Sequence, residues 1–271
     1  MTEITLQELK QIELNILTQV HEVCTAQGLR YSLCGGTLLG AVRHGGFIPW
    51  DDDIDILMPR PDYEALIAYC RANETPFRLV SHQTDADYHY LFAKACAPDT
   101  LIVEENNNRN STDMGVYIDI FPIDGLAESE EQGRRLLKSQ RFSLELLVAY
   151  AWRKFLPSRT RAWYYEPIRF VFYAMSRLID PNRFIRKIER RATAVAFDTA
   201  AYAGSYAGVY RSREVLPADV YAQCDDMVFE GRTFRAMTQY DAYLKCLYGD
   251  YMHLPPKEQQ VSHHLFHAYR R

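Results

Sequence analysis

Four carboxylates in five consecutive positions constrain this chain more than any other feature of its sequence. They are Asp51, Asp52, Asp53 and Asp55. Ionised groups packed this closely repel one another, so the arrangement is unfavourable at neutral pH unless a cation neutralises it. An acidic cluster can also be a solvated loop, but Trp50 before the run and Ile56-Leu57 after it are not typical loop residues. The run therefore predicts a folded, cation-binding segment.

The alternation of side chains along an extended segment makes this prediction more specific. Successive side chains of a strand point to opposite faces, so Asp51, Asp53 and Asp55 share one face and Ile54 and Ile56 the other. Carboxylate oxygens suit Mg²⁺ or Mn²⁺ and not zinc. We expect Asp53 and Asp55 to be catalytic and to hold such an ion, with Asp51 as an optional further ligand.

A glycine turn lies just upstream of the acids. Gly35-Gly36-Thr37 opens a short predicted helix, and phosphate binds readily to the backbone N–H groups at a helix N-terminus. Arg43 and His44 follow at the end of that helix. A Gly-Gly turn alone is a weak signal, but here all three features lie within 21 residues. Together they predict a phosphate site beside a metal site, as phosphoryl transfer requires, with a catalytic role for Arg43.

A further acid, Asp119, is expected to complete the site. It lies in the apolar segment Gly115–Pro122, where an unpaired carboxylate would be costly to bury. A paired structural aspartate is the alternative, but the pattern favours a metal ligand or a general base. Asp124, directly before Gly125, is interpreted as a turn residue.

The pattern of apolar residues divides the chain into two parts. Residues 1–125 predict an α+β catalytic core with a mixed sheet, and residues 126–271 a mainly helical region that completes the substrate site. Helices are expected at residues 6–29, 37–43, 59–72, 128–151, 161–178, 182–200 and 240–248. Strands are expected at 31–34, 53–58, 77–80, 90–95, 101–104 and 114–121, with a hairpin at 227–234.

Composition argues against several classes of protein. The net charge of −4 lacks the basic excess of a nucleic-acid binder that works by bulk electrostatics. The N-terminus does not resemble a secretory signal, and no apolar run approaches the roughly 18 residues of a spanning helix. Six dispersed cysteines are typical of reduced thiols. We therefore expect a cytoplasmic protein.

Three long motifs resemble the LicD family. They are GGTLLGAVRHGGFIPWDDDID (35–55), GVYIDIFPIDG (115–125) and YDAYLKCLYGDYMHLPP (240–256). The resemblance implies a nucleotidyltransferase-like core. For bacterial members it implies transfer of phosphocholine from CDP-choline to a sugar of a cell-surface glycan, such as teichoic acid or lipopolysaccharide, or of its lipid-linked precursor. Fukutin-type relatives transfer another phospho-alcohol and carry a membrane anchor, which is not found in this sequence.

The resemblance also assigns roles to residues. Its glycine pair, Arg-His pair and acids correspond to Gly35, Gly36, Arg43, His44, Asp51, Asp53, Asp55 and Asp119. Lys94 is expected on a neighbouring strand in contact with phosphate, with an exposed strand lysine as the alternative. The block Tyr248–Met252 either closes on the site or packs against the core. Aromatic rings can hold a quaternary ammonium group, and the tyrosines that adjoin the motifs are Tyr88, Tyr90, Tyr117, Tyr248 and Tyr251.

Two other functions compete with phosphotransfer. A glycosyltransferase that holds a nucleotide sugar through a metal explains the acids equally well, but it leaves the glycine turn and Arg43-His44 unexplained. A non-catalytic binding module is disfavoured because every acid that the chemistry needs is present.

Aromatic and basic residues are interleaved between Trp152 and Arg177. The basic residues are Arg153, Lys154, Arg159, Arg161, Arg169 and Arg177. Such a segment could lie on an anionic membrane surface without spanning it. A helical subdomain whose aromatic residues fill its own core is the slightly favoured alternative.

Overall fold

The computed structural model describes residues 1–104, 109, 113–158, 162–208, 210–260 and 266–271. The α-helices are α1 (Leu6–Gln27), α2 (Gly35–His44), α3 (Arg60–Ala72), α4 (Glu130–Ala151), α5 (Glu166–Ser176), α6 (Pro181–Ala192), α7 (Ala218–Ala222) and α8 (Tyr240–Tyr248). The 3-10 helices are η2 (Trp163–Tyr165), η3 (Phe197–Thr199), η4 (Arg211–Glu214) and η5 (Lys257–Gln259). The strands are β1 (Thr2–Glu3), β2 (Ser32–Leu33), β3 (Asp55–Pro59), β4 (Arg78–Val80), β5 (Ala93–Cys96), β6 (Thr100–Glu104), β7 (Tyr117–Ala127), β8 (Tyr202–Gly204), β9 (Leu216–Pro217), β10 (Cys224–Phe229), β11 (Arg232–Met237) and β12 (Phe266–Arg270).

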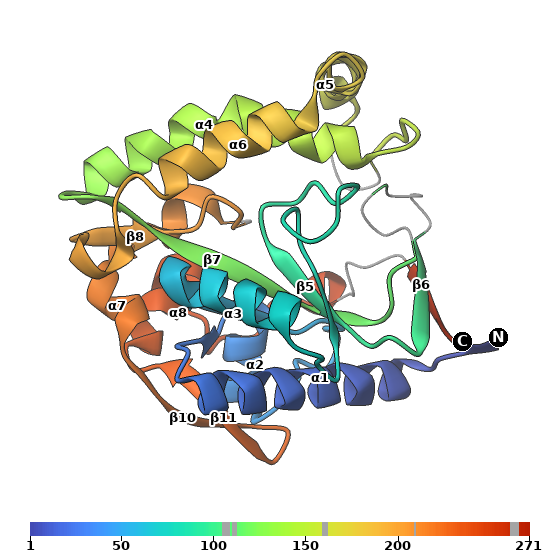
Figure 1. The fold of residues 1–271 in the computed structure, drawn as a ribbon, viewed down its shortest axis with the longest axis vertical. Coiled ribbons are helices and arrows are strands. Elements are labelled where there is room, and N and C mark those ends of the chain that lie inside the picture. The colour runs from blue at the N-terminus through green and yellow to red at the C-terminus, as the bar shows by residue number, and fades with distance from the viewer. Residues whose placement is uncertain (105–108, 110–112, 159–161, 209, 261–265) are drawn as a thin grey trace.

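The main sheet is mixed, as the sequence predicted. Its strands lie in the order β10-β11-β2-β3-β7-β5-β4, with β8 and β9 attached to the far end of β7. The pairs β2–β11 and β3–β7 are parallel, and the other pairs in this order are antiparallel. A small second sheet, β1-β12-β6, holds the two chain ends side by side (Figure 1).

Helices lie on both sides of the main sheet. In Figure 1, α1 runs below strand β7, and α4 and α6 run above it. Helix α1 begins at a capping box, in which Thr5 and Glu8 bond each other's backbone N–H, and it ends at Gly28 with a left-handed φ of 66°. This matches the predicted helix and its glycine stop. Its buried side, which includes Leu17 and Val20, belongs to the largest apolar core.

Strand β7 is longer than the sequence predicted. Asp124 and Gly125 read as a turn, but they lie inside the strand, and Asp124 is fully buried. Arg60, at the start of α3, explains the difference, because its Nε lies 2.6 Å from Oδ1 of Asp124. Burial raises the pKa of the Asp124 carboxyl to about 6 although Arg60 opposes the shift. The Nη1 of Arg60 also lies 3.3 Å from Oε2 of Glu189, and this contact links α6 to the same ion pair.

The predicted division at residue 125 therefore falls within β7. Besides the predicted hairpin, the part beyond it supplies β8, β9 and β12, and β11 of the hairpin pairs directly with β2 in the main sheet. The largest apolar core runs from Ile4 to Ala268 and draws on both parts. The predicted hairpin and the helix at 240–248 are confirmed as β10–β11 and α8.

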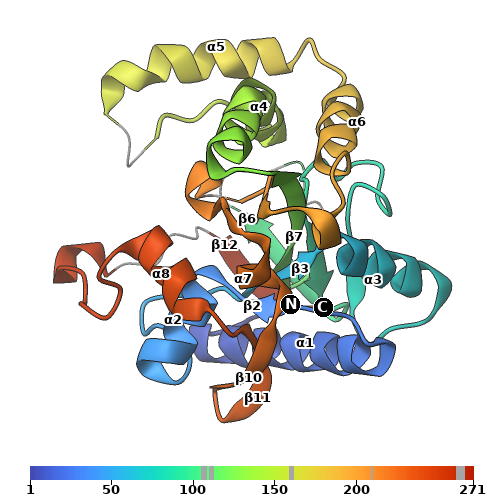
Figure 2. The same cartoon turned by 90° about the vertical axis from the view of Figure 1, so that its left-hand side faces the viewer.

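Three helices form a layer beyond this core. Helices α4, α5 and α6 lie near the positions predicted for them, and α4 packs against α5 and α6. Figure 2 shows α5 lying across the outer side of α4, far from the main sheet. Arg159 and Arg161 of the predicted membrane-binding segment lie outside the described residues.

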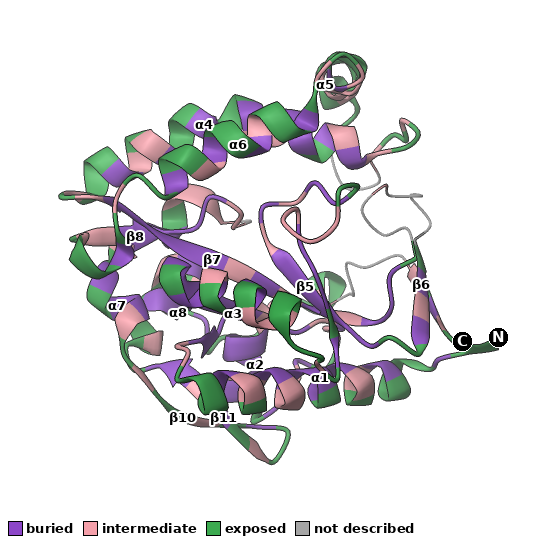
Figure 3. Cartoon of the chain, in the orientation of Figure 1, coloured by how far each residue is buried: buried purple, intermediate pink, exposed green. Residues whose placement is uncertain are grey.

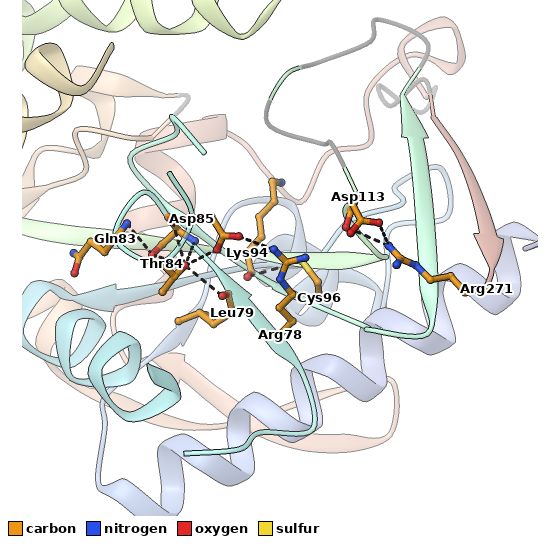
Figure 4. A network of polar contacts seen from close by, with 10 residues as sticks. Arg78, Leu79, Gln83, Thr84, Asp85, Lys94, Cys96, Asp113 and Arg271 are labelled. Atoms are coloured by element: carbon orange, nitrogen blue, oxygen red, sulfur yellow. Dashed lines mark hydrogen bonds and ion pairs between the residues drawn. The ribbon is translucent and has the colours of Figure 1, made fainter. Parts of the chain in front are cut away.

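The buried ion pair generates the first prediction. Arg60→Ala should lower the free energy of unfolding by about 3–5 kcal/mol, because it leaves the Asp124 carboxylate buried without its partner. The matched control is Arg78→Ala, which removes the half-exposed pair with Asp85 shown in Figure 4 and should cost less than about 1 kcal/mol. Urea unfolding of both variants measures the difference. Equal losses would contradict a special role for the buried pair.

Candidate active site

Adjacent strands place three predicted site residues side by side. Asp55 on β3 is in register with Asp119 on β7, and Asp119 is in register with Lys94 on β5. The Lys94 ammonium lies 2.5 Å from Oδ1 of Asp119 and 3.3 Å from the centre of the Tyr117 ring. Lys94 is on a neighbouring strand, as predicted, but it is buried and bonded to Asp119. Contact between Lys94 and phosphate stays a prediction.

Asp55 is held at the junction between α2 and β3. Its backbone N–H donates to the hydroxyl of Thr37 at 2.8 Å, so this buried threonine positions the acid. Burial raises the pKa of the Asp55 carboxyl well above its ordinary value, and the charges of Asp53, Asp119 and Asp51 raise it further. The site therefore combines carboxylates whose joint ionisation needs a compensating cation.

The side chains of the acid run alternate between two sides of the chain, as predicted, although β3 itself begins only at Asp55. Asp51, Asp53 and Asp55 line one cleft, whereas Asp52 is buried and does not line it. Helix α2 approaches the acids closely because it begins with two glycines. A Cβ at Gly36 would lie 2.4 Å from Oδ2 of Asp51. Any larger residue there would displace the acid.

The cleft has a volume of about 1110 Å³ and is walled on one side by the C-terminal segment. This wall includes Tyr248, Asp250, Tyr251 and the residues from His253 to Pro256. Arg43 holds it in place, because its Nη1 donates to the carbonyl oxygen of Tyr251 at 2.7 Å. The block at 248–252 thus closes on the site, and Tyr251 also packs against the core. Arg43 lines the cleft, but His44 is exposed beside Trp50 and does not.

The described residues include no group of three or more acidic, histidine or cysteine side chains placed as a ready metal site. The donor set still suits a hard divalent cation, because it consists of carboxylates that burial and mutual repulsion disfavour as free anions. Asp53 and Asp55, which line the cleft together with Asp51, are the residues that could hold such an ion, and Asp119 lies in register with Asp55 on the next strand.

A side pocket beside the acids was not predicted. It is lined by Cys34, Gly35, Asp55, Leu57, Phe121, Ile123, Ser205, Gly208, Tyr210, Glu214 and Tyr243. Its residues come from the start of α2, from β3, β7, η4 and α8, and from the segment between β8 and η4, so only the fold brings them together. Of the tyrosines singled out from the sequence, Tyr248 and Tyr251 line the main cleft, and Tyr88, Tyr90 and Tyr117 pack in a separate apolar cluster.

Glu214 is the unusual residue of this pocket. It is buried, and its Oε2 has no hydrogen-bond partner among the residues that the structure describes. Burial raises the pKa of this carboxyl to about 8, although the backbone of Arg211 opposes the shift. In the sequence Glu214 follows Arg-Ser-Arg, which is typical of a solvated segment, so no sequence signal pointed to it.

The fold and the site define a mixed α/β protein with a carboxylate-lined cleft at the centre of its sheet. The family model described as the LicD/FKTN/FKRP nucleotidyltransferase domain matches residues 28–160. The chain is 30% identical to the lipopolysaccharide cholinephosphotransferase LicD of Haemophilus influenzae. The alignment is 275 residues long and covers 99% of each chain. A short stretch of 34 residues, 12% of this chain, is 62% identical to the ribitol 5-phosphate transferase FKRP of Homo sapiens and covers 7% of that protein. The chain belongs to the LicD family.

The buried Glu214 predicts a pH-dependent stability. Its pKa in the folded protein, about 8, lies above its ordinary value of 4.5, so unfolding releases a proton between these pH values. The wild type should therefore lose stability as pH rises through this window. Glu214→Gln should remove that loss and become progressively more stable than the wild type, levelling off above pH 8.

Urea unfolding at about pH 5, 7 and 9 measures this trend. The exposed Glu128 provides the matched control, since Glu128→Gln should follow the wild type at every pH. A constant difference between Glu214→Gln and the wild type across the window would contradict the prediction.

Proposed function

We propose that this protein transfers phosphocholine, or a related phospho-alcohol, from a CDP-alcohol to a sugar hydroxyl of a cell-surface glycan or its lipid-linked precursor. Full-length similarity to a cholinephosphotransferase supports this proposal. The main structural support for the proposal is the position of Asp55. This acid lines both the large cleft and the side pocket, so it lies where the two meet.

The residues divide the chemistry between them. The nucleotide lies in the cleft, and the N-terminus of α2 at Gly35-Gly36 and the guanidinium of Arg43 face its phosphates. Asp53 and Asp55 would hold Mg²⁺ or Mn²⁺, and such an ion would supply positive charge beside the transferring phosphoryl group. The sugar oxygen forms a bond to the β-phosphorus, the bond from that phosphorus to CMP breaks, and the sugar hydroxyl loses its proton. Asp119, fixed by Lys94, either accepts that proton or completes the ligand set.

A glycosyltransferase remains the alternative for the same acids. The two reactions differ in their products, because phosphotransfer releases CMP from a CDP-alcohol and glycosyl transfer releases UDP or GDP from a nucleotide sugar. The glycine turn against Asp51 and the anchored Arg43 favour phosphotransfer, since both concentrate groups for binding phosphate beside the acids.

Replacement of one acid tests the proposed chemistry. Asp55→Asn should abolish CMP release from CDP-choline and raise the melting temperature measured without metal, because it removes a buried carboxylate from among its like-charged neighbours. Product analysis and thermal unfolding are the measurements. Glu128→Gln again serves as the exposed control. Near-normal activity of Asp55→Asn would remove this residue from the mechanism.

We also propose that the outer helical layer contacts a membrane surface. Within the described residues, no helix is both long and apolar enough to cross a bilayer. Helix α5 instead has an apolar side that no other described element covers. All residues of this helix are described, and Ser176 is the only one of them that is buried. Figure 3 shows α5 as largely exposed.

Three exposed apolar residues of α5 follow helical spacing. Ile168, Val171 and Met175 recur every three or four positions and therefore lie on one side of the helix. Tyr164 and Leu178, just before and after α5, and Phe170 within it are exposed as well. Trp163 and Tyr165 adjoin this stripe at the start of α5, and such rings settle at membrane interfaces.

Charge points to an anionic surface as the partner. Residues 128–200 contain 15 arginines and lysines against 8 acidic residues, although the whole chain is net negative. Arg153 and Lys154 are exposed, and the Arg153 carbonyl oxygen accepts from the hydroxyl of Tyr173 on α5 at 3.2 Å. Two other basic residues of this segment are held within the protein, Arg169 by Glu166 at 2.6 Å and Arg177 by the Tyr150 carbonyl at 2.8 Å.

Vesicle co-sedimentation tests this surface. The protein should bind phosphatidylglycerol vesicles but not phosphatidylcholine vesicles, and high salt should release it. The double variant Ile168→Ser/Val171→Ser should bind about tenfold more weakly or worse. Val228→Ser removes an equally exposed valine from β10 and should bind normally. Failure of the wild type to bind anionic vesicles would refute the proposal.

A further inference from the structure

We propose that the side pocket binds a quaternary ammonium group and that Glu214 is the residue that selects it. The inference rests on the proposed function, because the pocket would take the choline end of a donor whose nucleotide lies in the main cleft. It assigns a role to a carboxyl and to aromatic rings that the phosphotransfer chemistry does not use.

The position of the pocket fits the length of such a donor. The main cleft and the side pocket share Asp55 and Tyr210 in their walls. A phosphoryl group at the acids would therefore have the nucleotide on the cleft side and its alcohol on the pocket side. The space open to the centre of a water-sized sphere is about 30 Å³ in this pocket, against about 1110 Å³ on the same measure in the main cleft. This is a short cavity that suits the end of a small alcohol.

Glu214 places an ionisable carboxyl at one defined point in the pocket wall. Its Oε2 is buried and has no hydrogen-bond partner within the described part of the chain. Gly208 leaves room for the carboxyl, since a Cβ there would lie 1.8 Å from Oε2. Burial of the free carboxylate is costly, which is why the pKa of this carboxyl lies at about 8. A bound cation would supply the counter-charge that lowers this pKa, so Glu214 would carry its negative charge when a cation occupies the pocket.

The remaining walls favour a cation covered by methyl groups over a polyol. Leu57, Phe121 and Ile123 are apolar and offer no side-chain hydrogen bonds. The two tyrosine hydroxyls are already engaged, because Tyr210 donates to Tyr248 at 2.7 Å and Tyr243 accepts from the N–H of Gly35 at 3.3 Å. Their rings stay available for a cation–π contact. Besides the oxygens of Glu214, Asp55 and Ser205, the side chains of this wall offer a polyol few partners, so ribitol or glycerol would lose most of its hydrogen bonds to water, whereas a trimethylammonium group makes none.

The experiment compares a cation with its neutral twin. The two ligands are CDP-choline and the CDP ester of 3,3-dimethylbutanol, in which carbon replaces the quaternary nitrogen and the shape is kept. Calorimetry with Mg²⁺ should show that the wild type binds CDP-choline at least about tenfold more tightly. In Glu214→Gln the preference should fall to about twofold or less, because the negative charge is gone while the shape of the pocket is kept.

Two further variants separate charge from fold. Gly208→Ala keeps the acid but pushes its carboxyl aside, so it should also reduce the preference. Glu128→Gln, on the exposed surface, should leave it unchanged. Unaltered CMP binding by Glu214→Gln and Gly208→Ala shows that the main cleft is intact.

The outcomes distinguish the pocket from the reaction. Equal binding of the two ligands by the wild type, no binding of CDP-choline, or an unchanged preference in Glu214→Gln would each overturn the pocket. CMP release without any charge preference would leave the proposed reaction standing and refute the pocket. A charge preference that depends on Glu214, without CMP release, would support the pocket and refute the reaction.

Discussion

The repulsion among carboxylates on adjacent strands is the constraint on which the rest of this structure depends. Parallel pairing of β3 and β7 sets Asp55 directly beside Asp119, and Lys94 on the next strand offsets part of the negative charge. Two glycines then bring the start of α2 against the acids, and Thr37 fixes the backbone at Asp55. Like charges at such distances destabilise a fold, so a protein keeps them where they serve binding or catalysis.

Local pattern was enough to predict some of this arrangement. The helix at 6–27, the hairpin and the helix at 240–248 follow from apolar periodicity and from glycines that need a left-handed φ. The alternation of Asp51, Asp53 and Asp55 also carried over, since it depends only on an extended backbone. These features are determined by residues close together in the chain.

Features that depend on distant partners could not be predicted in the same way. Asp124-Gly125 has the composition of a turn, and Arg60, 64 residues earlier, supplies the counter-charge that lets the strand continue. Glu214 has the composition of a solvated segment until the strands and α8 enclose it. The aromatic and basic residues of α5 were visible in the sequence, but which of them face α4 depends on packing. Arg169 and Arg177 therefore serve the helical layer itself.

The wall of the cleft has a consequence for the order in which the protein is made. Arg43 lies early in the chain, but it is bonded to the carbonyl oxygen of Tyr251, and β11 enters the sheet beside β2 from residues 232–237. Ribosomes synthesise the N-terminal part first, and folding can start before synthesis ends. A growing chain would thus hold Asp51, Asp53, Asp55 and Asp119 long before it could close the cleft around them. The residues that complete the cleft wall are translated near the end, so these four acids of an unfinished chain stay without that wall.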